Sequence, residues 1–176
     1  MMDRVSVVGS SGAGKSTLAR AIADRIDGRH VELDELFHQA GWIPTPTPEL
    51  RRNVAAALDV DRWVVCGNYT KVADLVQGGA DTIVWLDLPR WLVISRLIRR
   101  SVKRAITREE LWNGNRESWR NLISRDPERN VVLWSWQHHH RYRQRYEDFA
   151  TGKFWAHAEV HRLCSRRDVQ QFLGEH

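Results

Sequence analysis

The chain has 176 residues, of which 42% are hydrophobic and 28% are charged, and its formal net charge is +5 at pH 7. This length and composition are typical of one globular domain with its own core. No apolar run approaches the roughly 20 residues that cross a bilayer, which excludes a membrane-spanning helix.

The two halves of the chain differ in charge. Residues 1–87 carry 9 Lys and Arg against 12 Asp and Glu, whereas residues 88–176 carry 18 against 10. This asymmetry suits an anionic ligand, either nucleotide phosphates or nucleic acid. An expected strand begins directly after Met1-Met2-Asp3, which predicts no signal peptide. Cys66 and Cys164 lie in apolar stretches and are expected to be buried free thiols in a reducing cytoplasm.

Strand-like and helix-like patterns alternate along the chain. Strand-like runs predict strands at residues 4–8, 30–33, 63–66, 82–86 and 159–163. Helical spacing predicts helices at residues 15–26, 47–58, 89–105 and 165–173, with one or two more within 117–149, broken near Asp126-Pro127. Thr47 is expected to cap the second helix, with Pro48 at its first position. The alternation predicts a parallel sheet covered on both faces.

A glycine-rich run between the first strand and the first helix has the P-loop pattern Gly-x-x-x-x-Gly-Lys-Ser in its confirming context. Its backbone N–H groups can surround phosphate oxygens at the positive end of the helix. Lys15 can reach the β and γ phosphates, and Ser16 can ligate Mg²⁺. We therefore expect ATP and Mg²⁺ as cofactors, with ATP bound by Gly9, Ser10, Ser11, Gly12, Ala13, Gly14, Lys15, Ser16 and Thr17.

Several stretches together resemble adenylate-kinase-like enzymes. Residues 80–89, continuing to Arg96 and Arg100, look like their fourth strand and the helix that enters the lid. Residues 34–42, 63–69 and 163–173 are similar to a bacterial subgroup often labelled DNA topology modulation proteins. The resemblance spans nearly the whole chain and is least specific between residues 105 and 158.

The resemblance implies an α/β P-loop NTPase fold, with a five-stranded parallel sheet flanked by helices and a helical lid region. Residues 1–176 would form one kinase-like domain, with a core at 1–104 and 159–176, an acceptor-binding segment at about 35–60 and a lid at about 105–158. The implied activity is ATP-dependent phosphotransfer to a small-molecule acceptor, a nucleoside monophosphate or a metabolite of similar size.

Arginines around the phosphates are also implied by the resemblance. Arg96 would lie against the base or phosphates of ATP, and Arg100, on the same helix face, would reach the transferring phosphoryl group. Arg141 would return from the lid to the substrate, and Ser165 and Arg166 would contact the nucleotide. Solvated surface charge is the alternative for each arginine.

Candidate acceptor residues follow the second and third strands. Asp34 can orient or deprotonate the acceptor, or hold Mg²⁺ through water, whereas capping of a short helix is the alternative. Gly67, Asn68 and Tyr69 lie at the carboxyl end of the third strand, the usual ligand edge of such sheets. Trp42 and Tyr69 can stack on an acceptor ring or simply pack.

Cys66 departs from the family pattern, because related proteins commonly carry an acid there that holds a Mg²⁺-bound water. Asp34 or Asp87 can compensate, but Asp87 follows the fourth strand and a purely structural role is its alternative; without compensation, catalysis would be slow or absent. His138, His139 and His140 do not predict a metal site, since consecutive helical residues diverge by about 100°.

A nucleic-acid-associated ATP-binding protein is the alternative function. Its basic second half would contact a phosphate backbone. The chain has no helix-turn-helix signature and no basic tail, so this alternative is less favoured. The pattern does not indicate an oligomeric state.

Overall fold

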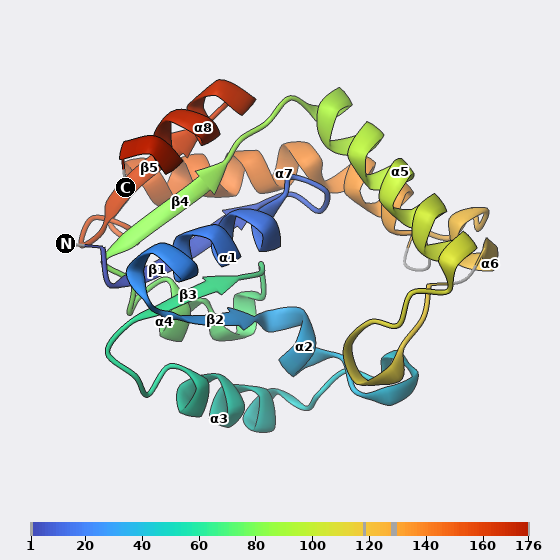
Figure 1. Ribbon diagram of the computed structural model, residues 1–176, viewed down its shortest axis with the longest axis horizontal. Helices are drawn as coiled ribbons and strands as arrows, with labels where there is room; N and C mark the ends of the chain where they lie inside the picture. Colours follow the sequence, from blue (N-terminus) through green and yellow to red (C-terminus); the bar gives the residue numbers. More distant parts are fainter. Residues whose placement is uncertain (1, 118, 128–129, 176) are drawn as a thin grey trace.

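The five strands of the computed structural model, which describes residues 2–117, 119–127 and 130–175, form one sheet in the order β2-β3-β1-β4-β5 (Figure 1). Every neighbouring pair is parallel. The strands are β1 (Arg4–Gly9), β2 (Arg29–Glu32), β3 (Trp63–Cys66), β4 (Thr82–Leu86) and β5 (Glu159–Leu163). The α/β fold with a five-stranded parallel sheet is thereby confirmed.

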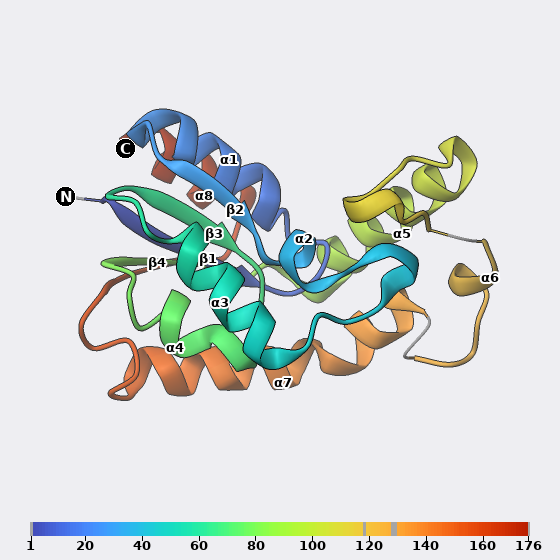
Figure 2. The same cartoon turned by 90° about the horizontal axis from the view of Figure 1, so that it is seen from below.

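Helices cover both faces of the sheet, which explains why β3 and β4 are fully buried and, except for Thr82, apolar. On one face, α1 (Lys15–Ile26) and α8 (Arg166–Glu175) pack against Val64, Val84 and their neighbours. On the other, α3 (Thr47–Ala57), α4 (Ala73–Val76) and the long α7 (Val131–Thr151) enclose a second apolar cluster (Figure 2). None of the helices in the described ranges has the length and hydropathy to cross a membrane.

The helices agree with the expectations in part. Pro46, not Thr47, is the N-cap of α3, so the helix starts at Thr47 and Pro48 lies within its first turn. The short α2 (Leu33–Phe37) and α4 have too few residues to show a helical period. The region 117–149 contains α6 (Trp119–Leu122) and α7, as the expected break near Asp126-Pro127 requires. Asn130 defines the start of α7 because its Oδ1 accepts bonds from two backbone N–H groups in the first turn.

The chain leaves the sheet after β4 along α5 (Arg90–Thr107) and then turns back through residues 108–117, which we call the bridging segment (Figure 1). Asn115 Oδ1 accepts a bond of 2.8 Å from the Trp42 backbone N–H. Asn113 Nδ2 donates a bond of 2.6 Å to the carbonyl of His38. The bridging segment is therefore hydrogen-bonded to residues 38–42, which follow β2 and α2.

Candidate active site

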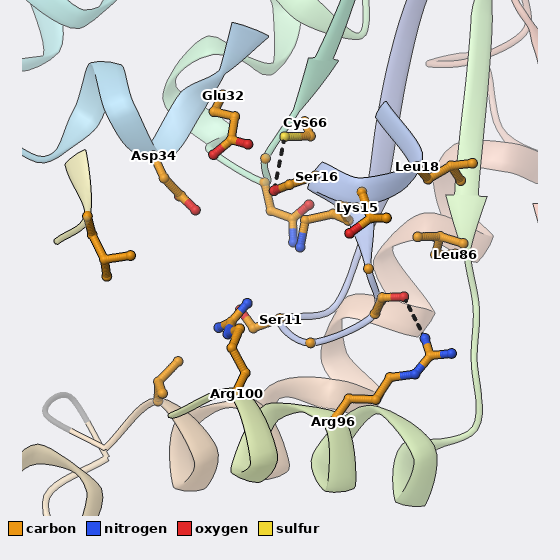
Figure 3. Close-up of a pocket in the computed structure, with 18 of the residues that line it drawn as sticks. Ser11, Lys15, Ser16, Leu18, Glu32, Asp34, Cys66, Leu86, Arg96 and Arg100 are labelled. Atoms are coloured by element: carbon orange, nitrogen blue, oxygen red, sulfur yellow. Dashed lines mark hydrogen bonds between the residues drawn. The ribbon is translucent and has the colours of Figure 1, made fainter. Parts of the chain in front are cut away.

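A cavity of about 1750 Å³ lies at the carboxyl ends of β1, β2 and β3, where ligands bind in open α/β sheets. Its wall combines the P-loop, the ends of β2 and β3, one side of α5, the bridging segment and parts of α7 and α8. Residues distant in sequence thus face one space, as the close-up shows for the P-loop, β2 and α5 (Figure 3).

The P-loop occupies the turn from β1 to α1, and its glycines are required by the backbone. Gly9, Gly12 and Gly14 have φ values of 144°, 87° and 100°. A Cβ at Gly9 would lie 2.7 Å from the Leu86 carbonyl oxygen, and one at Gly12 would lie 2.8 Å from that of Val93. The loop can therefore lie this close to β4 and α5 only with glycine at these positions.

Lys15 opens α1 and extends back along the loop. Its Nζ donates to the Ser10 carbonyl at 3.1 Å. Burial lowers the pKa of Lys15, and the nearby carboxylate of Asp34 partly opposes this effect. A cation held in a desolvated loop is suited to an anionic ligand that completes its pairing.

Arg96 and Arg100 come from successive turns of α5 and reach the P-loop (Figure 3). Arg96 donates to the Ala13 carbonyl at 3.1 Å, so it supports the loop from behind. Arg100 Nε is buried and has no hydrogen-bond partner. Burial, followed by the neighbouring Arg104, lowers the pKa of Arg100. This guanidinium is therefore under-paired and faces the same cavity as Lys15.

Asp34 lies in α2, on the opposite wall from the P-loop (Figure 3). Its Oδ1 accepts a hydrogen bond of 2.6 Å from the Tyr69 hydroxyl. Burial and Asp34 both raise the pKa of Tyr69, so this hydroxyl remains a donor. The N-cap of α2 is Glu32, so Asp34 does not cap the helix. Its second carboxylate oxygen has no hydrogen-bond partner among the residues that the structure describes.

Aromatic side chains form the wall around Asp34. The Phe37 and Tyr69 ring centroids are 4.4 Å apart, and His38 meets Trp42 edge-on at 5.2 Å. Trp112 of the bridging segment stacks against His38 at 6.4 Å. These five side chains line the cavity together, and we call them the aromatic wall.

Gly67 and Asn68 connect β3 to the aromatic wall. A Cβ at Gly67, whose φ is 139°, would lie 2.7 Å from Leu33 Cβ, so only glycine allows this approach. Asn68 Nδ2 donates to the Gly9 carbonyl at 2.5 Å and ties the loop after β3 to the P-loop.

Glu32 is a site residue that sequence reasoning missed. It ends β2, stands opposite Cys66 in the strand register and lines the cavity. The sequence feature that could have indicated Glu32 is its position two residues before Asp34, near the carboxyl end of an expected strand. The carboxylate of Glu32 on β2 thus lies beside Cys66 on β3, the position where related proteins commonly carry an acid.

Cys66 is a buried free thiol, as expected, whereas the expectation of burial is wrong for Cys164, which is exposed after the end of β5. Cys66 itself is not an anion here. Burial raises its pKa to about 11, and its Sγ lies 3.5 Å from Ser16 Oγ. Asp87 does not compensate for it, because Asp87 pairs with Arg162 at 2.7 Å and Arg143 at 3.3 Å and is not among the described cavity-lining residues. Of the two alternatives for Asp87, these ion pairs support the structural one and not a role at the metal.

Two predicted residues lie elsewhere. Arg141 is exposed on α7, which instead presents Val131, Trp134 and Tyr142 to the cavity. Ser165 exchanges hydrogen bonds with Asp168 at the start of α8, as a helix cap does.

Other predicted residues are distributed as follows. Arg166 lines the cavity, as do Ser11, Gly12, Ala13, Gly14, Lys15, Ser16 and Thr17. Gly9 and Ser10 contribute through the backbone contacts described above. His138 and His139 bond to different backbone carbonyls, those of Trp134 and Leu88.

The fold is similar to those of several small-molecule kinases. Shikimate kinase from Acinetobacter baumannii, in complex with shikimate, superposes with a TM-score of 0.56 at 13% identity, covering 99% of this chain and 90% of that one. Shikimate kinase from Bacteroides thetaiotaomicron gives 0.53 at 16% identity, covering 99% and 96%. This chain has a shikimate-kinase-like P-loop fold. A gluconokinase from Sinorhizobium meliloti 1021 shares this fold at a TM-score of 0.51 and 14% identity, covering 98% and 92%.

Comparison of sequences gives less information than comparison of structures. No protein-family model matches the chain. A Bacillus subtilis (strain 168) protein, described as uncharacterized protein YqaC, is 26% identical over 110 residues, which span 59% of this chain and 60% of that protein. The resemblance to P-loop kinases therefore holds at the level of the fold, while membership of the DNA topology modulation subgroup stays a prediction.

Proposed function

We propose that this protein is an ATP-dependent phosphotransferase that acts on a small hydroxylated metabolite. The observation that carries the proposal is the position of Lys15 and Asp34 on opposite walls of one cavity, with Arg100 reaching into it (Figure 3). Phosphoryl transfer is catalysed mainly by positioning and by neutralising charge, and these three residues are suited to that task.

ATP would bind with its phosphates in the P-loop. The backbone N–H groups of residues 11–16 and the Lys15 ammonium would hold the phosphates, while Arg96 and Arg166 flank the outer side of the loop. Ser16, Glu32 and Asp34 offer oxygen donors, which Mg²⁺ prefers, so they fit the metal either directly or through water. Bound there, Mg²⁺ would neutralise charge on the phosphates.

Asp34 would hold the acceptor hydroxyl and take its proton as the phosphoryl group moves. Tyr69 fixes one carboxylate oxygen, and the Asp34 side chain points into the cavity (Figure 3). Arg100 would gain most from charge that develops on the transferring group, because its guanidinium is buried and under-paired in the free protein.

The aromatic wall bears on the class of acceptor. Among the described residues that line the cavity, Lys and Arg side chains come from α1, α5 and α8, and the aromatic wall adds none. A ring that carries hydroxyl groups can place its apolar face on aromatic side chains. The wall offers no arginine clamp for an acceptor phosphate, so we favour a hydroxylated metabolite over the nucleoside monophosphate that the sequence resemblance implied.

The nucleic-acid alternative is weakened by pairing within the fold. Arg104 pairs with Glu117 at 2.9 Å, and Arg162 pairs with Asp87 at 2.7 Å and Glu147 at 2.9 Å. Part of the positive charge of the second half is thus already neutralised and is not available for a phosphate backbone.

A transfer screen with γ-labelled ATP and Mg²⁺ tests the proposal. The acceptors are sugars, sugar acids, cyclic hydroxy acids and all nucleoside monophosphates, with Lys15→Ala and Asp34→Asn as controls. We expect label on one hydroxylated metabolite, and on none in either variant. Transfer to a nucleoside monophosphate alone would overturn the acceptor class. The absence of transfer to every acceptor, with ATP still bound, would overturn the phosphotransferase itself.

A further inference from the structure

His30, Glu32 and Cys66 form a cluster beside the P-loop that the proposed reaction does not fully use. His30 and Glu32 are two residues apart on β2, so they project from one face, and Cys66 stands opposite Glu32 on β3. One nitrogen, one oxygen and one sulfur atom of these residues all lie within 4.8 Å of one another. The nitrogen of His30 is 3.8 Å from Cys66 Sγ and 3.9 Å from Glu32 Oε1.

We propose that His30, Glu32 and Cys66 bind a transition-metal ion of the Zn²⁺ type, and that this ion inhibits the neighbouring phosphate site. The inference concerns a second metal, and its binding step does not depend on the proposed function. Imidazole, carboxylate and thiolate are the ligands that Zn²⁺ takes, whereas Mg²⁺ prefers oxygen alone. The donor set therefore selects against the metal expected with ATP.

The spacing is close to what a tetrahedral ion requires. Metal–ligand distances of about 2.0–2.3 Å place neighbouring ligand atoms about 3.5 Å apart. The two separations from His30 are 3.8 and 3.9 Å, and all three ligand atoms lie within 4.8 Å of one another, so side-chain movements without a backbone shift can bring them to this value. Cys66 binds as thiolate: the S–H bond breaks, the proton goes to solvent and the sulfur–metal bond forms.

The surroundings already orient one ligand. Trp112 Nε1 donates to Glu32 Oε2 at 3.0 Å, which leaves Oε1 facing His30. Hydrogen bonds of this kind to a ligating carboxylate are typical of metal sites. Arg20 lies 3.7 Å from Oε1, but its side chain is 69% exposed and is free to turn into solvent as the metal enters.

Inhibition follows from the position of Ser16. Its Oγ lies 3.5 Å from Cys66 Sγ, so a metal bound to the cluster would sit next to the hydroxyl expected to serve Mg²⁺ (Figure 3). The same metal would also take Glu32, the nearest acid of that site. Zn²⁺ and Mg²⁺·ATP would therefore compete for the part of the cavity around Ser16 and Glu32.

Co²⁺ is the probe for the binding step, because a Co²⁺–thiolate bond gives a charge-transfer absorption band and a tetrahedral site gives intense visible bands. The metal-free protein is titrated with Co²⁺ and then with Zn²⁺, without nucleotide. We expect one Co²⁺ per chain with a thiolate band that Zn²⁺ abolishes. The variants are His30→Gln and Cys66→Ser, and the matched control is Cys164→Ser, which removes the exposed second cysteine.

The band should vanish in Cys66→Ser, remain in Cys164→Ser, and require at least about tenfold more Co²⁺ in His30→Gln. No Co²⁺ binding in the wild type, or a band that depends on Cys164, would overturn the site. His30→Gln changes a partly exposed side chain and keeps the test valid if Cys66→Ser does not fold.

Inhibition is measured separately, as Mg²⁺·ATP affinity with and without Zn²⁺. We expect at least about tenfold weaker ATP binding in the wild type with Zn²⁺ and little change in His30→Gln. If the wild type binds Mg²⁺·ATP with the same affinity without Zn²⁺ and at saturating Zn²⁺, the proposed inhibition is wrong. A protein that binds Co²⁺ as expected but never binds ATP would contradict the proposed function and leave the metal site supported.

Discussion

Trp112 donates its indole N–H to Glu32 at 3.0 Å, across 80 residues of sequence. The donor belongs to the bridging segment and the acceptor to the end of β2, so this bond joins the two sides of the cavity. A hydrogen bond to a carboxylate contributes about 1.5–3 kcal/mol. It therefore contributes measurably to holding the bridging segment against the end of β2.

Trp112→Phe removes the donor and keeps an aromatic ring in the wall. We expect faster amide hydrogen exchange in residues 108–117 and a loss of about 1–2 kcal/mol in unfolding free energy. Trp91→Phe is the control, since Trp91 is 71% exposed on α5. Unchanged exchange in the bridging segment would mean that the bond does not hold it.

Lys15→Met should separate binding from folding. The ammonium has one backbone partner and a pKa lowered by burial, so its removal should leave the melting temperature of the free protein unchanged or higher. The rise in melting temperature that ATP causes should disappear, because ligand stabilisation requires binding. Thermal unfolding with and without ATP measures both effects. A variant still stabilised by ATP as strongly as the wild type would contradict the role of Lys15.

Arg100→Met should lower kcat by about 10³-fold and change ATP affinity little, because its charge counts most in the transition state. Arg99→Met, on the exposed side of the same helix, should behave like the wild type. Arg100→Lys should recover little, since an ammonium lacks the planar fork. Steady-state kinetics with the acceptor from the transfer screen check these values. An equal loss in both methionine variants would indicate damage to α5 rather than a lost catalytic group.

Asp34→Asn should lower transfer at least about 10²-fold while ATP binding is kept, because the amide is a poor general base. Tyr69→Phe should lower it about tenfold, because Asp34 then loses the donor that fixes its orientation. Label transfer and ATP titration, run on the same samples, distinguish the steps. If Asp34→Asn instead weakens ATP binding and leaves turnover normal, Asp34 acts in nucleotide binding and not at the acceptor hydroxyl.

The stability of the protein should fall in mild acid. Burial lowers the pKa of His139 despite its bond to the Leu88 carbonyl, so the folded state holds this imidazole neutral. The unfolded chain takes up the proton near pH 6.5, and unfolding free energy therefore decreases as the pH falls below that value toward the folded pKa. Denaturant titrations at pH 7.5 and 5.5 measure the difference. His139→Gln should show a smaller difference than the wild type, whereas the exposed His140→Gln should not.

Local sequence patterns determined the strands, α1 and the P-loop. Residues 63–66, 82–86 and 159–163 match their strands without error. For β3 and β4 the physical reason is that strands covered on both faces are almost continuously apolar, whereas β5 mixes apolar and polar residues and is only partly buried. The three glycines and Lys15 could be interpreted because a phosphate loop is built from consecutive residues. Short helices such as α2 contain too few residues to show a helical period, so the sequence did not predict them.

Only the tertiary structure decided what stands across from the P-loop. Parallel register brings Glu32 beside Cys66, and the return of the bridging segment brings Trp112 to Glu32. The same packing pairs Asp87 with Arg162, which turns a candidate metal ligand into a structural ion pair. These relations join residues about 30 to 80 positions apart, and such contacts follow from how elements pack rather than from any local pattern.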